Sequence, residues 1–179
     1  KIKMRVEHIR KMTELVDIFI APSHFLISRF TEFGIGENII IFSPYGLNSN
    51  LFRNFQRKKS ERLRFGFIGT ILPAKGLDIL INAFNKIKDN QAELKIYGKL
   101  FPYRGFEYYP RFIKRLARNG NIRFMGGFDH KDISSVFSGI DVLVFPSIWN
   151  ENCPLTILEA FSTKTPTIVS RIGGAPELV

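Results

Sequence analysis

From residue 64 to the end of the chain, short apolar runs alternate with longer segments of mixed polarity. The apolar runs are RFGFIG, AELKIYG, NIRFMG, DVLVFPS and PTIVS, and each predicts a strand. After the first run, apolar side chains recur at helical spacing at Leu77, Leu80, Ile81, Phe84 and Ile87. The remaining helical segments are FEYYPRFIKRLARNG, HKDISSVFSGI and PLTILEAFST, and APELV starts one more. The pattern therefore predicts five strand–helix units.

Short, almost continuous apolar strands separated by helices indicate a parallel sheet covered on both faces. Right-handed crossovers then give an α/β fold with a Rossmann-like, doubly wound parallel sheet. In such folds ligands bind at the carboxyl ends of the strands, so the loops that follow the strands are where chemistry is expected. One helix, FEYYPRFIKRLARNG, is expected to be disturbed at Pro110 and to end at Gly120.

The first 63 residues follow a different pattern. Residues 1–52 read as helix, strand, helix and strand, and we interpret them as the tail of a preceding α/β domain and the crossing to the next one. Residues 53–63 lie in the dense basic run RNFQRKKSERLR, which we interpret as a solvated linker. Residues 64–179 then form the main domain. Both ends of the chain indicate a fragment of a longer protein.

Composition narrows the class of protein without choosing a function. Hydrophobic residues make up 45% of the chain, so a sizeable core is expected and disorder is not. No apolar run approaches the ~20 residues of a membrane-spanning helix, and the first residues do not resemble a signal peptide. A single cysteine, Cys153, forms no internal disulfide, which favours a reducing, cytoplasmic location. The net charge of +10 attracts anions in general: nucleic acid, anionic lipid or phosphorylated small molecules.

The first candidate motif, GTILPAKG, follows the first strand of the main domain. Gly69 permits a tight turn, and Lys75 lies just before a helix, an arrangement suited to binding an anion. The motif is neither a P-loop nor the G-x-G-x-x-G dinucleotide fingerprint. By itself it is more simply interpreted as a turn glycine with a surface lysine.

The second candidate is WNENCPLTILEAF, after the fourth strand. Asn152 or Cys153 is expected to cap the helix, with Pro154 in its first turn. The free N–H groups of Leu155 and Thr156 would then face the carboxyl ends of the strands with the positive end of the helix dipole. This position suits a phosphate group. Cys153 in such a place is either a reactive thiol or, more simply, a small residue near the cap.

Two glutamates flank this helix start. Glu151 lies in the preceding loop, and Glu159 lies roughly 6–8 Å along the helix from Leu155. Carboxylates accept hydrogen bonds from the neighbouring hydroxyls of sugars and riboses. The alternative is one exposed loop glutamate and one ordinary surface glutamate. The apolar neighbours of Glu159 argue against that alternative, since a carboxylate there needs a partner.

Other features carry weaker signals. Gly173 and Gly174 either offer a further close backbone approach after the last strand or, more simply, form a flexible loop. His130 is interpreted as a residue at a helix start, because the three histidines share no metal-ligand spacing, and no D-x-D pair or G-x-S-x-G motif is present. The aromatic stretch YGKLFPYRGFEYYP either packs in the protein or stacks on bases.

Taken in order, these segments resemble the nucleotide-sugar-binding half of retaining GT-B glycosyltransferases of the group 1 type (glycosyltransferase family 4). The matching segments are FGFIGTILPAKGLDILINAF, LKIYG, NIRFMGGFDHKDISSVFSGIDVLVFPSIWNENCPLTILEAF and PTIVSRIGGAPELV, covering residues 64–179. The spacing of Glu151 and Glu159, with seven residues between them, is the most specific element. The segment DIFIAPSHFLISRF is similar to the end of that family's N-terminal domain.

The resemblance implies a role for each matched residue. Lys75 would contact the donor diphosphate, and the backbone around Cys153, Leu155 and Thr156 would hold phosphate and sugar. Glu151 would bind hydroxyls of the transferred hexose and Glu159 those of the ribose, with the loop through Phe128 along the base. Gly69, Thr70 and Pro154 would complete the donor site. No metal or other cofactor would be needed, and the sugar would be transferred with retention.

The chain departs from the family pattern at three places. Thr70 stands where an arginine is frequent, Pro154 where a glycine is frequent, and a second glycine usual near Gly98 is replaced. The acceptor-binding domain and a closing helix are absent, so we expect a donor-binding fragment that does not turn over alone. Its acceptor, whether glycan, lipid-linked or small, is open, as is peripheral contact with the inner face of the membrane. Alternatives are a nucleic-acid or membrane-surface module, or a GT-B relative such as a nucleotide-sugar epimerase. Under the preferred hypothesis no nucleic acid is bound.

Overall fold

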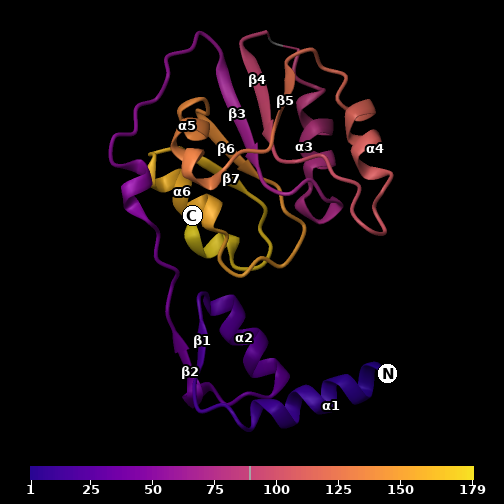
Figure 1. The fold of residues 1–179 in the computed structure, drawn as a ribbon, viewed down its shortest axis with the longest axis vertical. Helices are drawn as coiled ribbons and strands as arrows, with labels where there is room; N and C mark the ends of the chain where they lie inside the picture. Colours follow the sequence, from indigo (N-terminus) through magenta and orange to yellow (C-terminus); the bar gives the residue numbers. More distant parts are fainter. Residues whose placement is uncertain (89) are drawn as a thin grey trace. The chain divides into compact units, whose positions relative to one another are not determined.

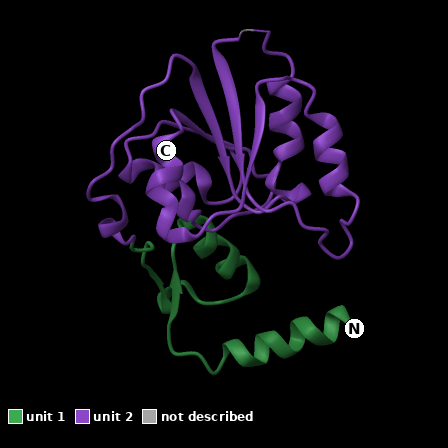
Figure 2. Ribbon diagram, turned by 45° about the horizontal axis from the view of Figure 1, so that its top comes forward, with its two compact units in different colours: residues 1–46 green, residues 47–179 purple. Residues whose placement is uncertain are grey.

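The computed structural model describes residues 1–88 and 90–179, and the chain divides into two units, residues 1–46 and 47–179 (Figure 2). The second unit contains the parallel sheet. Its strands are β3 (Leu63–Ile68), β4 (Ala92–Tyr97), β5 (Ile122–Gly126), β6 (Val142–Phe145) and β7 (Thr167–Val169). Their spatial order is β5-β4-β3-β6-β7, with every neighbouring pair parallel.

This order identifies the point at which the sheet changes its direction of growth. From β3 the chain adds β4 and β5 on one side, then returns to add β6 and β7 on the other (Figure 1). The carboxyl ends of β3 and β6 therefore flank the position where doubly wound folds bind ligands. The five predicted strands and the Rossmann-like class are confirmed.

Helices cover both faces because successive strand side chains alternate between them. On one face, Phe67, Leu94 and Ile96 pack with α3 (Leu77–Phe84) and α4 (Tyr109–Leu116). On the other, Ile68 and Leu143 pack with α5 (Ile133–Ser138) and α6 (Leu155–Ser162). In Figure 1, α3 and α4 lie beside β5, and α5 and α6 lie beside β6 and β7. Separate apolar clusters on the two faces thus hold the sheet in place.

Two helix predictions need correction. Pro110 does not disturb α4, because the helix begins at Tyr109 and the proline occupies its first turn, where no N–H is required. The helix also ends at Leu116, before Gly120. The segment HKDISSVFSGI is a 3-10 turn, η4 (His130–Asp132), followed by the short α5. APELV does start a helical turn, η5 (Ala175–Leu178).

The basic run before β3 is more than a solvated linker. Arg57 donates to the carbonyl of Ile140, and its Nη2 lies 3.0 Å from the carbonyl oxygen of Thr163. Arg64, only 4% exposed, bonds Asp141 through two nitrogens at 2.9 and 2.8 Å. Upstream, Phe52 of η2 (Ser49–Phe52) is buried against α5. The division between the units at Gly46 and Leu47 accordingly comes before these residues.

The first unit has the predicted order of helix, strand, helix and strand. Its elements are α1 (Ile2–Thr13), β1 (Phe19–Ala21), α2 (His24–Phe33), the 3-10 turn η1 (Glu37–Ile39) and β2 (Ile40–Phe42), with the two strands parallel. Ser23 Oγ caps α2 by accepting from Leu26 N at 3.2 Å, and Gly34 closes it with φ of 105°. Within the described residues, no helix has the length and apolarity needed to cross a bilayer.

Candidate functional site

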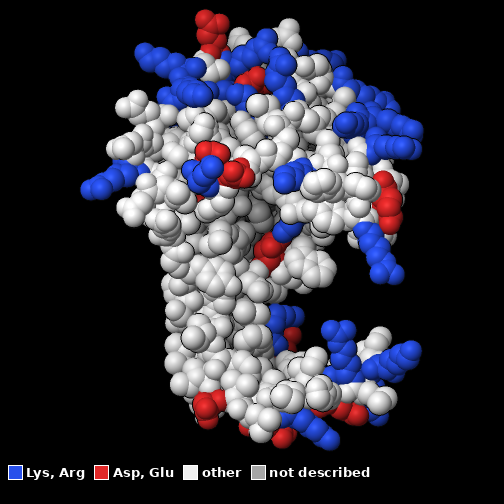
Figure 3. Space-filling view, in the orientation of Figure 1, with Lys and Arg blue, Asp and Glu red and all other residues white. Residues whose placement is uncertain are grey.

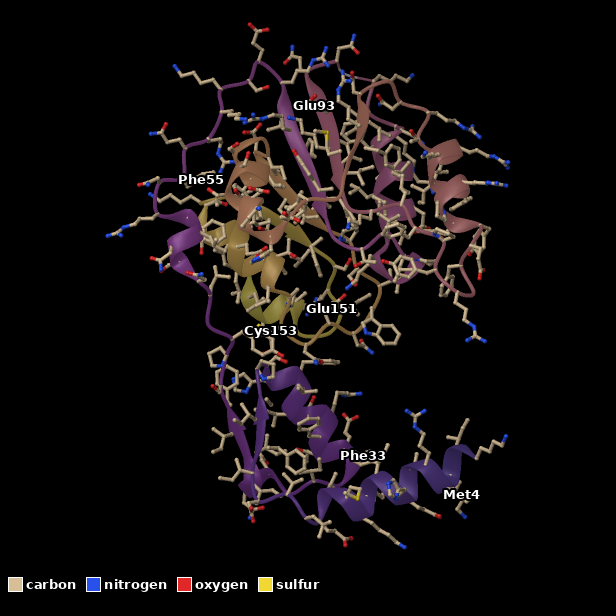
Figure 4. All side chains as sticks on the ribbon, in the orientation of Figure 1. Met4, Phe33, Phe55, Glu93, Glu151 and Cys153 are labelled. Carbon is tan, nitrogen blue, oxygen red and sulfur yellow. The ribbon has the colours of Figure 1, made fainter. Side chains whose placement is uncertain are left out.

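The loops after β3 and β6 meet at the carboxyl ends of these strands. Ile148 N donates to the carbonyl of Ala74 at 3.0 Å, which ties the two loops together directly. Figure 4 shows Glu151 and Cys153 at this end of the second unit, while Glu93, near the start of β4, lies toward the opposite end. The two candidate motifs, far apart in sequence, therefore meet in the folded unit.

Lys75 and Glu151 contact each other at this junction. Lys75 Nζ forms an ion pair with Glu151 Oε1, and Ser147 Oγ lies 3.0 Å from the same carboxylate oxygen. Both side chains are partly shielded, with exposed fractions of 29% and 17%. Lys75 ends the 3-10 turn η3 (Pro73–Lys75), which places its side chain toward the β6 loop. Ser147 was not predicted, since a lone serine after a strand carries no signal of this contact.

Two glycines set the backbone around this pair. Gly76 has φ of +66°, and a Cβ there would lie 2.0 Å from the carbonyl oxygen of Pro146. The chain bends at Gly69 as expected, but without a positive φ, so the left-handed position of this loop is Gly76. Gly173, with φ of +65°, leaves no room for a Cβ beside Glu151, whose carbonyl oxygen would be 2.6 Å away. Gly174 N donates to that carbonyl oxygen at 2.7 Å. The close backbone contact predicted for this glycine pair is therefore made with the loop that contains Glu151.

The start of α6 differs from the prediction in its cap. The capping position is Pro154 rather than Asn152 or Cys153, and no side chain caps the helix. Leu155 and Thr156 begin the helix, so their N–H groups have no partner within it. Cys153 is buried, 6% exposed, which argues against a reactive thiol at this surface. The first turn of α6 thus has neither a capping side chain nor an acidic residue to balance the positive end of the helix dipole.

Glu159 has a partner on another element. Its side chain is 5% exposed, and Oε1 lies 2.6 Å from His130 Nε2, while His130 is 64% exposed. The alternative of an ordinary surface glutamate is wrong, because α6 turns Glu159 inward. His130 had been interpreted only as a residue at a helix start. The contact joins residues 29 positions apart, and their spacing gave no signal of it.

The third part of the site is a cavity of about 280 Å³ at the ends of β3, β4 and β5. Gly69, Thr70 and Phe128 line it, together with Lys99. The ring of Phe128 meets that of Tyr97 edge to face, with centroids 6.1 Å apart. Burial raises the pKa of Tyr97 above its ordinary value, with a smaller contribution from the charge of Glu93. The cavity therefore offers flat apolar walls and one cation.

The structure thus brings the predicted site residues into three neighbouring groups at the carboxyl ends of the strands. These are the Lys75–Glu151 pair with the start of α6, the Glu159–His130 contact, and the cavity that Gly69, Thr70 and Phe128 line. Among the described residues, no three His, Cys, Asp or Glu side chains form a group that could hold a metal ion. The arrangement suits a ligand with an anionic centre, hydroxyl groups and a flat ring.

Comparison with known proteins identifies relatives along most of the chain. The model of the family described as "Glycosyl transferases group 1" matches residues 48–179. The D-inositol 3-phosphate glycosyltransferase of Corynebacterium efficiens is 30% identical over 159 residues, covering 84% of this chain and 37% of the relative. The MMP alpha-(1->4)-mannosyltransferase of Mycolicibacterium hassiacum is 23% identical over 99% of this chain and 42% of the relative. The chain therefore spans less than half the length of these curated relatives.

Solved structures show the same fold. The structure of Anabaena HepE in complex with UDP and glucose has a TM-score of 0.77 and 21% identity, covering 92% of this chain and 47% of that one. A glycosyltransferase from Rickettsia africae has a TM-score of 0.78 and 23% identity, covering 90% and 46%.

Proposed function

We propose that this chain, which belongs to the group 1 glycosyl transferases, is the donor-binding part of an enzyme that transfers a hexose from a nucleoside diphosphate sugar to an acceptor. The observation that carries the proposal is the Lys75–Glu151 ion pair beside the uncapped start of α6. It places a cation, two free backbone donors and a carboxylate within one junction of the sheet.

Each part of the junction matches one part of such a donor. The diphosphate would lie at the start of α6 and draw Lys75 away from Glu151, since a doubly charged group competes strongly for an ammonium ion. Glu151, released from Lys75 but still bonded to Ser147, would accept hydrogen bonds from hydroxyls of the hexose. Thr70, at the place of a frequent arginine, would add a hydroxyl rather than a second cation.

The nucleoside would extend from the diphosphate toward the other two groups. Glu159 would accept hydrogen bonds from the ribose hydroxyls, and the cavity beside Phe128 would hold the base. The names of the relatives support this class of donor, because they refer to glycosyl and mannosyl transfer, and the Anabaena protein binds UDP and glucose.

In the reaction, the bond that breaks joins the anomeric carbon to the diphosphate oxygen. Lys75 and the helix dipole would stabilise the negative charge that grows on the departing diphosphate, without a metal ion. Glu151 would hold the hexose in place while the acceptor approaches, and transfer would occur with retention. The acceptor would be bound by parts of the protein beyond this donor site, so the chain alone would bind the donor without turning it over.

Calorimetry with UDP, GDP and ADP tests the proposal. One nucleotide should bind, and Lys75→Ala and Glu159→Gln should each weaken it roughly tenfold, the effect of losing one hydrogen bond to a charged group. Lys86→Ala, which removes an exposed charge beyond the end of α3, serves as the control and should bind normally. Unchanged affinity in both site variants would refute the proposal. Salt-sensitive binding of RNA without any nucleotide binding would favour the nucleic-acid alternative instead.

A further inference from the structure

Exposed aromatic rings and unpaired cations gather where the loop after β4 leads into α4. Four large rings are exposed by 41–60%, namely Phe101, Phe106, Tyr108 and Phe112. A folded surface that leaves several large rings in water is unusual, and such patches mark interaction sites. Phe101 also lines the cavity proposed for the base, but the nucleotide proposal makes no use of Phe106, Tyr108 or Phe112.

The helix arranges these residues in parallel rows. Tyr109 and Ile113, four positions apart, are buried and attach α4 to the rest of the unit. Beside that row lie Tyr108 and Phe112, also four positions apart, and next to them Arg111 and Arg115. A cavity of about 820 Å³ lies between these two outer rows and the preceding loop, lined also by Pro102, Glu107 and Pro110. The helix thus presents rings and guanidinium groups to the same concave surface.

The charge of this region is strongly positive. Residues 99–118 contain six Lys and Arg and one carboxylate, Glu107. The net charge of this stretch is therefore half of the net charge of the whole chain. In the described part of the chain, no ion pair involves Arg104, Arg111, Lys114, Arg115 or Arg118. Figure 3 shows blue side chains gathered on the α4 side of the second unit. These cations therefore lack internal partners.

We propose that this face, formed by residues 99–108 and α4, binds the surface of an anionic lipid bilayer. Its guanidinium groups would contact lipid phosphates, while the rings enter the boundary between headgroups and acyl chains. Arginine suits this position because its long stem packs along apolar surface while the charged end reaches phosphate.

The composition of the face favours a bilayer over a nucleic acid. Three of the four exposed rings are phenylalanines, and Pro102 and Pro110 extend the apolar surface around the cavity. The rings form a cluster at one helix end rather than a row that follows a strand of successive bases. A cluster of this kind suits a broad interface with phosphates above and apolar chains below.

The proposed face can be tested separately from the nucleotide site. The loop after β4 borders both the cavity beside Phe128 and the cavity beside α4. The two cavities share no lining residue. Substitutions at Arg111, Phe112 or Arg115 therefore leave the walls of the nucleotide cavity intact. All the side chains to be changed are exposed, so the fold should be retained.

Vesicle flotation of the full chain measures the binding. The protein should float with vesicles that contain phosphatidylglycerol and stay below with vesicles of phosphatidylcholine alone. Arg111→Gln with Arg115→Gln should weaken the binding roughly 25-fold, from about fivefold for each cation at an anionic surface. Tyr108→Ser with Phe112→Ser should also weaken it, and should abolish the part that persists at high salt. Lys58→Gln with Lys59→Gln removes the same charge from an exposed loop and should change little.

Three results would overturn the proposal. The first is an equal loss of binding in the Lys58 and Lys59 control, which would show that only total charge matters. The second is binding to neutral and anionic vesicles alike. The third is a chain that ignores vesicles but binds a single-stranded RNA through Arg111 and Arg115. Thermal melts of every variant confirm that it is folded.

Discussion

At the scale of single residues, His130 contacts a residue of the proposed nucleotide site but has so far been given no role in it. Its Nε2 lies 2.6 Å from Oε1 of Glu159, and Glu159 is almost fully buried. A buried carboxylate without a partner is costly and tends to change its position or its protonation. We therefore expect His130 to position Glu159 rather than to touch the hexose.

Replacing His130 tests this role. His130→Ala should weaken nucleotide binding several-fold, roughly five- to tenfold for one charge-assisted hydrogen bond. His130→Gln, which keeps a donor near the carboxylate, should restore much of the affinity, whereas a merely structural role would not distinguish the two. Calorimetry also gives a cycle with Glu159→Gln: once the carboxylate is gone, changing His130 should have little further effect. Independent, additive losses would contradict the assignment.

A second residue-scale prediction concerns Gly173. Gly173→Ala should place a Cβ about where the backbone of Glu151 now lies, at a φ that alanine disfavours. We expect the free energy of unfolding to fall by about 1–2 kcal/mol and nucleotide affinity to fall with it. Gly120→Ala is the matched control, because a Cβ at Gly120 meets nothing within 4 Å. Urea unfolding and calorimetry measure both effects, and equal behaviour of the two variants would rule out the steric explanation.

At the scale of elements, the ion pair between Arg64 and Asp141 joins β3 to the start of β6. The two residues lie 77 positions apart, and Arg64 is buried. The hydrogen bond from Arg64 holds the pKa of Asp141 below its ordinary value, despite some burial. The same bond raises the pKa of Arg64, so the two shifts agree in direction. The pair therefore fixes the two strands that flank the proposed diphosphate position.

This pair predicts an acid-dependent part of the stability. Because the folded pKa of Asp141 is lowered, its contribution is present above the ordinary aspartate pKa of about 3.9 and is lost as pH falls below it. Asp141→Asn should cost about 3 kcal/mol at neutral pH, since Arg64 would be left buried and unpaired. The variant should also lose less stability on acidification than the original chain. Urea unfolding at neutral and acidic pH measures this, and parallel pH profiles would contradict it.

Local patterns predicted most of the elements, and contacts between them account for the rest. The alternation of apolar runs and helical spacing predicted all five strands, because strand and helix periods are properties of neighbouring residues. The effect of Pro110 was predicted wrongly because the helix start was placed too early in the sequence. A proline breaks the interior of a helix but is tolerated in its first turn. Likewise, no local pattern marks Ser147 beside Glu151, since both lie in the irregular loop after β6. None marks His130 beside Glu159 either, since 29 positions separate them and only the folded domain brings η4 to α6.

At the scale of the whole molecule, the border between the two units differs from the break in sequence composition. The polar run suggested a domain starting at residue 64, whereas the unit with the sheet starts at Leu47. The reason lies in residues 47–57: Leu51, Phe52 and Phe55 belong to the core beside α5, and Arg57 bonds carbonyls of that region. Charge density indicated solvent exposure, but the apolar residues between the charges determine where this segment packs.

Two fragments test that border. Residues 47–179 should unfold cooperatively and bind the nucleotide as tightly as the full chain, because every proposed donor residue lies within them. Residues 64–179 should be less stable by several kcal/mol, since burial of Phe52 alone contributes roughly 2 kcal/mol. Thermal unfolding and calorimetry compare the two. Equal stability would show that the segment before β3 packs on the unit without stabilising it.

The contact between Lys75 and Glu151 also bears on selectivity among anions. A free phosphate ion can take Lys75 only by leaving Glu151 without a counter-charge in a partly shielded place. A nucleoside diphosphate sugar offers a phosphate to the lysine and hydroxyls to the glutamate at once. The ion pair therefore makes binding conditional on two chemically different groups held at a set separation. By this means a protein with a large positive charge can ignore most of the small anions that its charge attracts.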